Sequence, residues 1–295
     1  MKPLCIYHGH CDDGFAAAWA VRHGVGDGIF DFHPGVYQQN PPDVADRHVL
    51  MVDFSYKRPV LMEMAKQARS IVILDHHKTA AEDLAGFREP APFLEWHDST
   101  SGGLVEGTSE PIAALFDMDR SGAGLAWDFF HPTDRRPEFI DYIEDRDLWR
   151  KRLSGGDEFT IALRSYPQDF AVWDELVASG ALKLINQGSS IQRYYRLRVE
   201  ELKRSAYPTT IAGVPCWVSN APYFAASEVA GELAERGTDF GACYFEVSEG
   251  RWQYSLRSRG DFDVSAVAKQ FGGGGHAGAA GFSVNAPVHG PVTGF

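Results

Sequence analysis

The stretch Ser70-Ile71-Val72-Ile73-Leu74 is followed at once by Asp75-His76-His77. A short apolar run rich in β-branched residues is typical of a buried strand in a parallel sheet. Open α/β sheets bind their ligands beyond the carboxyl ends of their strands. Packing gives no reason for such a strand to end on a carboxylate and two imidazoles, so the stretch predicts a metal-binding, reactive site at this edge of the sheet.

The first half of the chain repeats this pattern. Strands are predicted for residues 4–8 and 49–53, and helices for residues 15–22 and 59–69. Short connections between alternating strands and helices favour a doubly wound parallel sheet. From Ser121, a predicted N-cap, the pattern becomes helical, and it ends in a long amphipathic helix with a basic face. We interpret that face as solvated, with phosphate steering as the alternative.

After Tyr207-Pro208 the pattern changes again, to three strand-like runs, with a helix at residues 225–236 between the first two and a last helix at residues 264–271 after the third. The runs cover residues 209–219, 241–247 and 252–257. The fold class is therefore α/β, with a smaller C-terminal α/β domain. We predict a catalytic metal-binding domain at 1–183, a helical linker at 184–206, a substrate-binding domain at 207–290 and a tail at 291–295.

Composition narrows the classes of function. The 295 residues are 44% hydrophobic and carry a net charge of −12, with 40 acidic against 28 basic side chains. An acidic surface disfavours duplex nucleic acid, whose binding depends on neutralised phosphates. No apolar run reaches the roughly 20 residues of a membrane span, and the N-terminus lacks a signal-peptide pattern, so a cytoplasmic location is expected. Four scattered cysteines disfavour disulfides and structural zinc.

Three predicted strand ends carry candidate ligands: the loop His8-Gly9-His10-Cys11-Asp12-Asp13-Gly14, Asp53, and residues 75–77. Asp145-Arg146-Asp147, at a helix end, is a fourth. Carboxylates and imidazoles suit Mn²⁺ or Mg²⁺, with Fe or Co as alternatives. Two such ions bridged by a carboxylate polarise a phosphoryl group and generate hydroxide. Asp53 alone is more often a turn residue, but three strand ends together predict a phosphoester-hydrolysing site.

A second signal is the glycine run Gly272–Gly275 before His276. Backbone amides in such a run can approach an anion closely and form a phosphate-binding nest. Arg257 and Arg259, at the end of the preceding strand, would add bidentate phosphate contacts. The alternative is a flexible turn with a solvated histidine.

These motifs together resemble the DHH phosphoesterase family, in the branch with a C-terminal accessory domain that includes nanoRNases and exopolyphosphatase relatives. The resemblance runs from His8 to Phe282. It rests on Asp75-His76-His77, on Gly272 to His276 with Ala277-Gly278-Ala279-Ala280-Gly281-Phe282, and on Ser255-Leu256-Arg257-Ser258-Arg259 with Asp263-Val264. It implies a two-domain enzyme with metals on the first domain and substrate in the cleft between domains.

The resemblance also implies roles for individual residues. Asp53 would bridge the ions, His76 would ligate one of them, His77 would face the scissile phosphate and Asp75 would orient a histidine. Asp145 is the expected helix-end ligand, with Asp147 as fallback. The far end of the substrate would be held by Arg257, Gly274, Gly275 and His276.

The first motif departs from the pattern of many relatives, His-x-x-x-Asp-x-Asp. Counting from His8 selects Asp12, whereas counting back from Gly14 selects Asp13. We expect His8 and Asp13 as ligands, and Asp12 as the second choice. His10 or Cys11 approaching a metal, and a single tight site, are alternatives.

The predicted function is a Mn²⁺-dependent phosphohydrolase with two ions, Mg²⁺ or Co²⁺ being alternatives, that attacks phosphorus in line with metal-bound hydroxide. Its substrate would be a small phosphorylated nucleotide or a short single-stranded oligonucleotide, with Tyr223, Phe224 and Trp252 as candidates for base stacking. For Trp252 the alternative role is core packing. Polyphosphate or pyrophosphate hydrolysis is one alternative. A non-catalytic nucleotide-binding regulator, suggested by the Asp12-Asp13 spacing, is another.

Overall fold

The computed structural model describes residues 1–37, 39–93 and 111–290, and the predicted tail at 291–295 lies outside them. The chain divides into two compact units, Met1–Gln192 and Arg193–Phe295. Helix α9 (Ala181–Arg204) runs through the division, which lies inside the predicted linker at 184–206.

The first unit is built on a sheet of five parallel strands in the order β2-β1-β3-β4-β5. The strands are β1 (Leu4–His8), β2 (Asp31–Gly35), β3 (His48–Val52), β4 (Ser70–Asp75) and β5 (Ile112–Phe116). This order reverses direction between β1 and β3, and ligands of doubly wound sheets bind at such a switch point, beyond the carboxyl ends of the strands. The predicted parallel sheet is confirmed.

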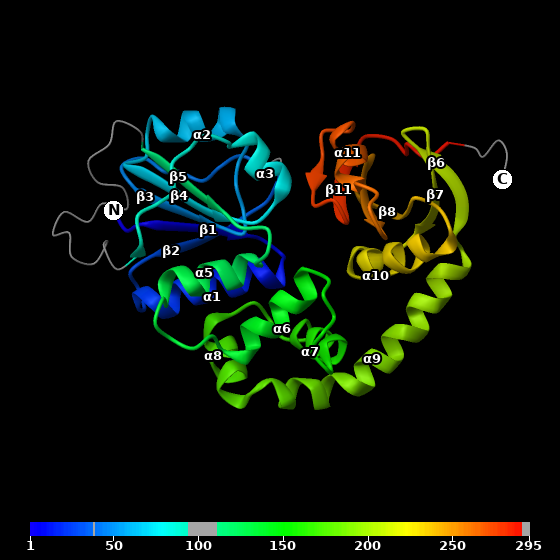
Figure 1. Cartoon of the computed structure of the whole chain (residues 1–295), viewed down its shortest axis with the longest axis horizontal. Coiled ribbons are helices and arrows are strands. Elements are labelled where there is room, and N and C mark those ends of the chain that lie inside the picture. Colours follow the sequence, from blue (N-terminus) through cyan, green and yellow to red (C-terminus); the bar gives the residue numbers. More distant parts are fainter. Residues whose placement is uncertain (38, 94–110, 291–295) are drawn as a thin grey trace. The chain divides into compact units, whose positions relative to one another are not determined.

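Helices cover both faces of this sheet (Figure 1). One face carries α1 (Asp12–Val25) and α5 (Gly122–Phe130), and the other carries α2 (Arg58–Ala65) and α3 (Lys78–Asp83). Along β4, Val72 and Leu74 belong to the core with α1 and α5, whereas Ile71 and Ile73 belong to the core on the α2 side. Burial on both faces explains why β4 is continuously apolar.

Further helices of this unit that the structure describes are α6 (Glu138–Asp147), α7 (Gly156–Leu163) and α8 (Phe170–Ser179). The predicted N-cap is confirmed, because Ser121 Oγ accepts the amide of Gly124 at 3.1 Å. Strands β2 and β5 and helices α3 and α7 were not predicted. Strand β2 is an edge strand of sequence Asp-Phe-His-Pro-Gly, and proline and glycine weaken the strand signal.

The second unit is a mixed sheet in the order β10-β11-β9-β8-β7-β6, in which only β7 and β8 pair in parallel. Its strands are β6 (Tyr207–Ile211), β7 (Val214–Asn220), β8 (Phe240–Ser248), β9 (Arg251–Ser258), β10 (Gly274–Gly275) and β11 (Ala279–Val284). The single run predicted at 209–219 is a hairpin. Ala212 and Gly213 have φ of 52° and 79°, as a type I′ turn requires.

Two helices cover this second sheet. Helix α10 (Tyr223–Leu233), followed by a 3₁₀ turn at Ala234–Arg236, packs with Val199 of α9 in one core. Helix α11 (Val264–Lys269) contributes to the other core, with Tyr254 and Phe282. Within the part of the chain that the structure describes, no helix is long and apolar enough to span a bilayer.

Candidate metal centre

The neighbouring strands β1 and β3 bring His8 and Asp53 together. Strand β1 ends on His8, Asp53 directly follows β3, and His8 Nδ1 lies 3.4 Å from Asp53 Oδ2. Asp53 has a left-handed backbone with φ of 55°, and its amide still donates to the carbonyl of Leu74 at 2.9 Å. That conformation costs a non-glycine residue about 1–2 kcal/mol, and such strain is concentrated at functional sites.

Asp13 is fixed by the start of helix α5. Its Oδ2 accepts the amide of Gly122 at 2.6 Å and its Oδ1 the amide of Ala123 at 3.0 Å. These are among the first amides of a helix, which lack partners within it and favour a negative charge. Asp12 points elsewhere, because its Oδ2 accepts from Arg164 Nε at 2.6 Å. The structure therefore brings Asp13, and not Asp12, to the candidate site.

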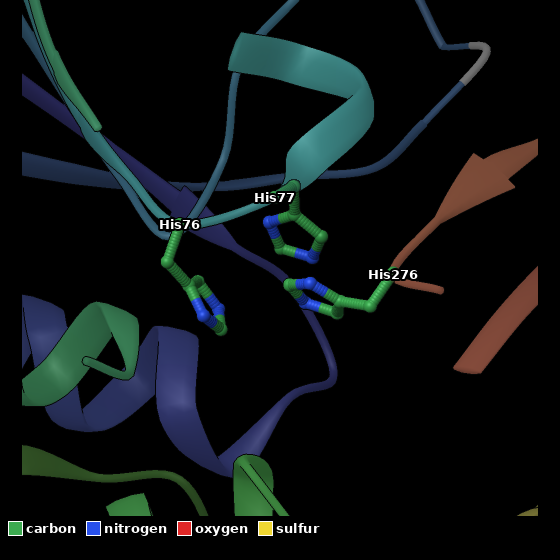
Figure 2. A group of neighbouring side chains, drawn as sticks. All are labelled: His76, His77 and His276. Atoms are coloured by element: carbon green, nitrogen blue, oxygen red, sulfur yellow. The ribbon is translucent and has the colours of Figure 1, made fainter. Parts of the chain in front are cut away.

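The end of β4 orients two histidines. Asp75 Oδ1 accepts the amide of His76 at 2.8 Å and lies 2.7 Å from Nδ1 of His77. Figure 2 shows the two rings projecting from the turn between β4 and α3. The rings are edge to face, with centroids 4.7 Å apart. Asp75 thus contacts both histidines, and its role in orienting them stays a prediction.

Nε2 of His76 faces three carboxylates from three different elements. It lies 3.0 Å from Asp53 Oδ1, 3.6 Å from Asp13 Oδ2 and 3.6 Å from Asp147 Oδ2. His76, Asp53 and Asp13 are buried, with exposed fractions of 2% or less. This convergence of an imidazole and three carboxylates is the centre of the candidate site.

Helix α6 contributes Asp147 to the site but directs Asp145 away from it. The carboxylate of Asp145 accepts the backbone amides of Arg152, at 3.0 Å to either oxygen, and of Leu153 at 3.1 Å. Asp145 therefore stabilises the loop after α6. Asp147, the second choice for the helix-end ligand, lies beside His76.

The crowded charges perturb the acidities of these groups. Burial raises the pKa of Asp13 well above its usual range, and the charges of Asp53 and Asp147 raise it further. Burial acts to lower the pKa of His76, but the hydrogen bond to Asp53 and the charge of Asp147 outweigh it and raise the pKa to about 11. Like charges at this density cannot all stay ionised without a balancing cation.

The residues present fit a divalent cation. Three groups in the first unit have ligand atoms within 4.8 Å of one another, and Asp53 belongs to two of them. The groups are His8 with Cys11 and Asp53, Asp13 with His76 and Asp147, and Asp53 with Asp75 and His77. Among the described residues, the buried Oδ2 atoms of Asp53 and Asp75 accept no hydrogen bond. Buried carboxylate oxygens normally have a partner, and a cation would supply one.

Two polar residues of the first motif, His10 and Asp12, lie outside the candidate ligand groups, whereas one aromatic ring lies beside them. His10 is exposed, and neither it nor Asp12 belongs to these groups among the described residues. Tyr37, which sequence reasoning missed, has its ring centroid 5.2 Å from that of His8 and 6.3 Å from that of His77. It follows strand β2, so recognising that strand would have placed it at the same sheet edge.

In the second unit the glycine run is an ordered turn. The amides of Gly272 and Gly273 donate to the last carbonyls of α11, at 3.1 and 3.0 Å. A Cβ on Gly273 would lie 2.1 Å from the carbonyl oxygen of Gly281, so the close approach of the chain requires glycine there. Two of the amides predicted to hold an anion are thus already engaged.

The other predicted substrate-binding residues lie at the end of the same sheet. Gly274 and Gly275 form β10 and pair with β11, and His276, labelled in Figure 2, follows them. Nη2 of Arg257 donates to Oγ of Ser227 at 2.8 Å, which fixes the guanidinium against helix α10. Substrate binding by these residues stays a prediction.

Comparisons with known proteins agree with this architecture. A DHHA1 domain model matches residues 217–289. An uncharacterized protein, R106, of Acanthamoeba polyphaga mimivirus is 30% identical over an alignment 306 positions long. The alignment covers 95% of this chain and 67% of the viral protein. The oligoribonuclease NrnB of Bacillus subtilis (strain 168) is 27% identical over 252 residues, 78% of this chain and 56% of NrnB. The chain belongs to the DHH phosphoesterase family.

A solved DHH domain shares this fold. It is the DHH domain of a member of the s1p family of ribosomal proteins. It matches this chain with a TM-score of 0.53 and 12% sequence identity, and the match covers 95% of this chain and 82% of that one. Family membership confirms the resemblance seen in the sequence and the predicted enzyme class, a hydrolase of phosphoester bonds. The chain spans just over half the length of NrnB.

Proposed function

We propose that this DHH phosphoesterase hydrolyses short nucleotidic phosphodiesters or small phosphorylated nucleotides with the help of two divalent cations, Mn²⁺ by preference. The observation that carries the proposal is the convergence of Asp13, Asp53 and Asp147 on Nε2 of His76 at the switch point of the parallel sheet. Several carboxylates gathered at a buried point repel one another, which favours a role in binding divalent cations over a purely structural role for these residues.

The cations would be held by His8, Asp13, Asp53, His76 and Asp147. Asp53 would serve both sets of ligands, since its Oδ2 lies 3.4 Å from Nδ1 of His8 and its Oδ1 lies 3.0 Å from Nε2 of His76. When bound, such ions stabilise charge on a phosphoryl group and acidify a water molecule. Asp13 keeps its orientation through the α5 amides, and Asp53 through its backbone bond to β4. Ligands held in this way need little rearrangement on binding.

His77 would contact the phosphate. Burial acts to lower the pKa of His77, but the adjacent Asp75 outweighs it, so the pKa is raised. With Nδ1 donating to Asp75, the protonated ring offers its Nε2–H to a phosphate oxygen. A donor aimed at an oxygen that gains charge in the transition state stabilises that state more than the substrate.

The net charge of the chain and the candidate binding residues of the second unit both bear on the size of the substrate. A net charge of −12 favours short substrates over long polyanions. We assign Arg257, Gly274, Gly275 and His276 to a terminal phosphate, and the exposed rings of Tyr223 and Phe224 to a base. Tyr223 and Ser227, which holds Arg257, lie four residues apart and so share a face of α10. The relative named as an oligoribonuclease supports a nucleotidic substrate.

The test is a substrate panel with Mn²⁺: dinucleotides, 3′,5′-bisphosphonucleoside, cyclic dinucleotides, polyphosphate and an aryl phosphodiester. We expect turnover of the short nucleotidic compounds and loss of turnover when the base is removed. Turnover of polyphosphate alone would instead favour the polyphosphate hydrolase. Phosphate-ligand binding without turnover of any compound would favour the non-catalytic regulator and contradict the proposal.

A further inference from the structure

Cys11 lies in the loop between β1 and α1, beside the candidate metal centre. Its Sγ and the ligand atoms of His8 and Asp53 are all within 4.8 Å of one another. Its carbonyl accepts the amide of Phe15 at 3.1 Å and Nε2 of Gln168 at 3.0 Å. The backbone of Cys11 is therefore held from two sides.

An independent observation points to a cation at this position. The side chain of Asp53 is only 2% exposed, and its Oδ2 accepts no hydrogen bond among the described residues. This oxygen lies 3.4 Å from Nδ1 of His8, which also lacks a hydrogen-bond partner there. Two buried polar atoms that face one another without a proper hydrogen bond suit a common ligand.

The first loop supplies no carboxylate to this position. Asp12 is paired with Arg164, and Asp13 is directed to the amides of α5 and to His76. Counted back from Gly14, Cys11 also occupies the place of the first aspartate in the Asp-x-Asp pattern of many relatives. A sulfur atom thus stands where an oxygen ligand would be expected.

We propose that Cys11 is a thiolate ligand in a sulfur, nitrogen and oxygen site with His8 and Asp53, and that this half of the centre prefers Co²⁺, Zn²⁺ or Fe²⁺ to Mg²⁺. A thiolate favours softer cations, whereas Mg²⁺ favours oxygen ligands alone. As the sulfur–metal bond forms, the thiol proton leaves to solvent and no oxidant is needed. The inference rests on the proposed metal dependence and not on the identity of the substrate.

The direct test is Co²⁺ binding to the chelator-treated full chain, followed by absorption. A sulfur-to-cobalt charge-transfer band should appear in the wild type and in Cys216→Ala, whose thiol is buried in the core of the second unit. Cys11→Ser should lose the band and weaken Co²⁺ binding by at least about tenfold, since even partners outside the ligand set contribute that much. Cys11→Asp should bind Co²⁺ without the band and gain affinity for Mg²⁺.

A second readout uses the unaltered chain. Alkylation of Cys11 by iodoacetamide, followed by mass spectrometry, should slow when Co²⁺ is added. The buried Cys5, Cys216 and Cys243 serve as internal references.

Co²⁺ binding to the wild type without the band, a band that persists in Cys11→Ser, or alkylation of Cys11 that Co²⁺ does not slow would overturn the inference. If Mn²⁺-dependent turnover is present in that case, the proposed function stands. A band that depends on Cys11, without turnover of any substrate, would support the thiolate ligand and contradict the proposed function.

Discussion

Oδ1 of Asp75 lies 2.7 Å from Nδ1 of His77 and also accepts the amide of His76, so one carboxylate oxygen sets the orientation of both histidines at the end of β4. Asp75 is fully buried, and its own pKa is lowered, because the charge and hydrogen bond of His77 outweigh the effect of burial. The pair therefore stays ionised, and His77 keeps its proton to a higher pH than an ordinary histidine.

The first prediction concerns the pH dependence of kcat in Asp75→Asn. Because Asp75 raises the pKa of His77, removing its charge lets that pKa fall toward the ordinary value of about 6.5. The protonated donor is then lost at lower pH, so the alkaline limb of the kcat profile moves to lower pH. At pH 8 we expect kcat to fall by about 10²-fold or more.

Steady-state kinetics across pH checks this prediction. Asp119→Asn, which changes an exposed aspartate of the same unit, should keep the wild-type profile. An alkaline limb that stays in place in Asp75→Asn would show that the carboxylate does not control the proton on His77.

The second prediction separates two aspartates of helix α6. Asp147→Asn removes a carboxylate 3.6 Å from Nε2 of His76, so Mn²⁺ affinity should fall by at least about tenfold while stability is retained. Asp145→Asn weakens bonds to the amides of Arg152 and Leu153, and should lower the free energy of unfolding by about 1–3 kcal/mol with Mn²⁺ affinity retained. Calorimetric Mn²⁺ titration and urea denaturation measure both. The reverse pattern would identify Asp145 as the ligand.

The third prediction is that Mn²⁺ uptake releases protons. His76, whose pKa is about 11, carries a second ring proton at neutral pH without the ion, and the raised pKa of Asp13 means that its carboxylate binds a proton more readily than an ordinary aspartate. A cation displaces these protons, so affinity rises with pH. Titration calorimetry in two buffers of different ionisation enthalpy gives the number released. Asp12→Asn should release as many as the wild type, and heats independent of buffer would count against the assigned ligands.

The fourth prediction concerns the contact between Gly122 and Asp53. A Cβ on Gly122 would lie 2.3 Å from that of Asp53, so Gly122→Ala must push α5 away from the site. We expect a loss of about 1–3 kcal/mol in stability and weaker Mn²⁺ binding. Gly156 is the matched control, because it also begins a helix and its Cβ would meet only Asp145 Oδ2, at 3.9 Å. Equal effects of the two substitutions would contradict the role given to Gly122.

The sequence was sufficient for the features that depend on periodicity. The apolar run of β4 and the polar residues after three strands predicted the parallel sheet and the edge at which His8, Asp53 and His76 meet. Parallel strands carry their carboxyl ends to one edge, so no knowledge of packing was needed.

The choice between neighbouring aspartates did depend on packing. Consecutive residues of a helix point about 100° apart, so Asp12 and Asp13 face different surroundings. Which of them enters the site is decided by Arg164 and by the start of α5, both more than a hundred residues away in sequence. The choice between Asp145 and Asp147 likewise depends on the loop that follows α6, whose amides bind Asp145.

Metal-dependent hydrolysis with His77 at the phosphate is tested by measuring the release of mononucleotides from a short single-stranded oligoribonucleotide by the chelator-treated chain, before and after Mn²⁺ is added. We predict turnover only with Mn²⁺, and a loss of about 10²-fold or more in a folded His77→Ala variant. Turnover that needs no divalent ion would rule out the metal dependence, and turnover that survives unchanged in His77→Ala would rule out the role of His77.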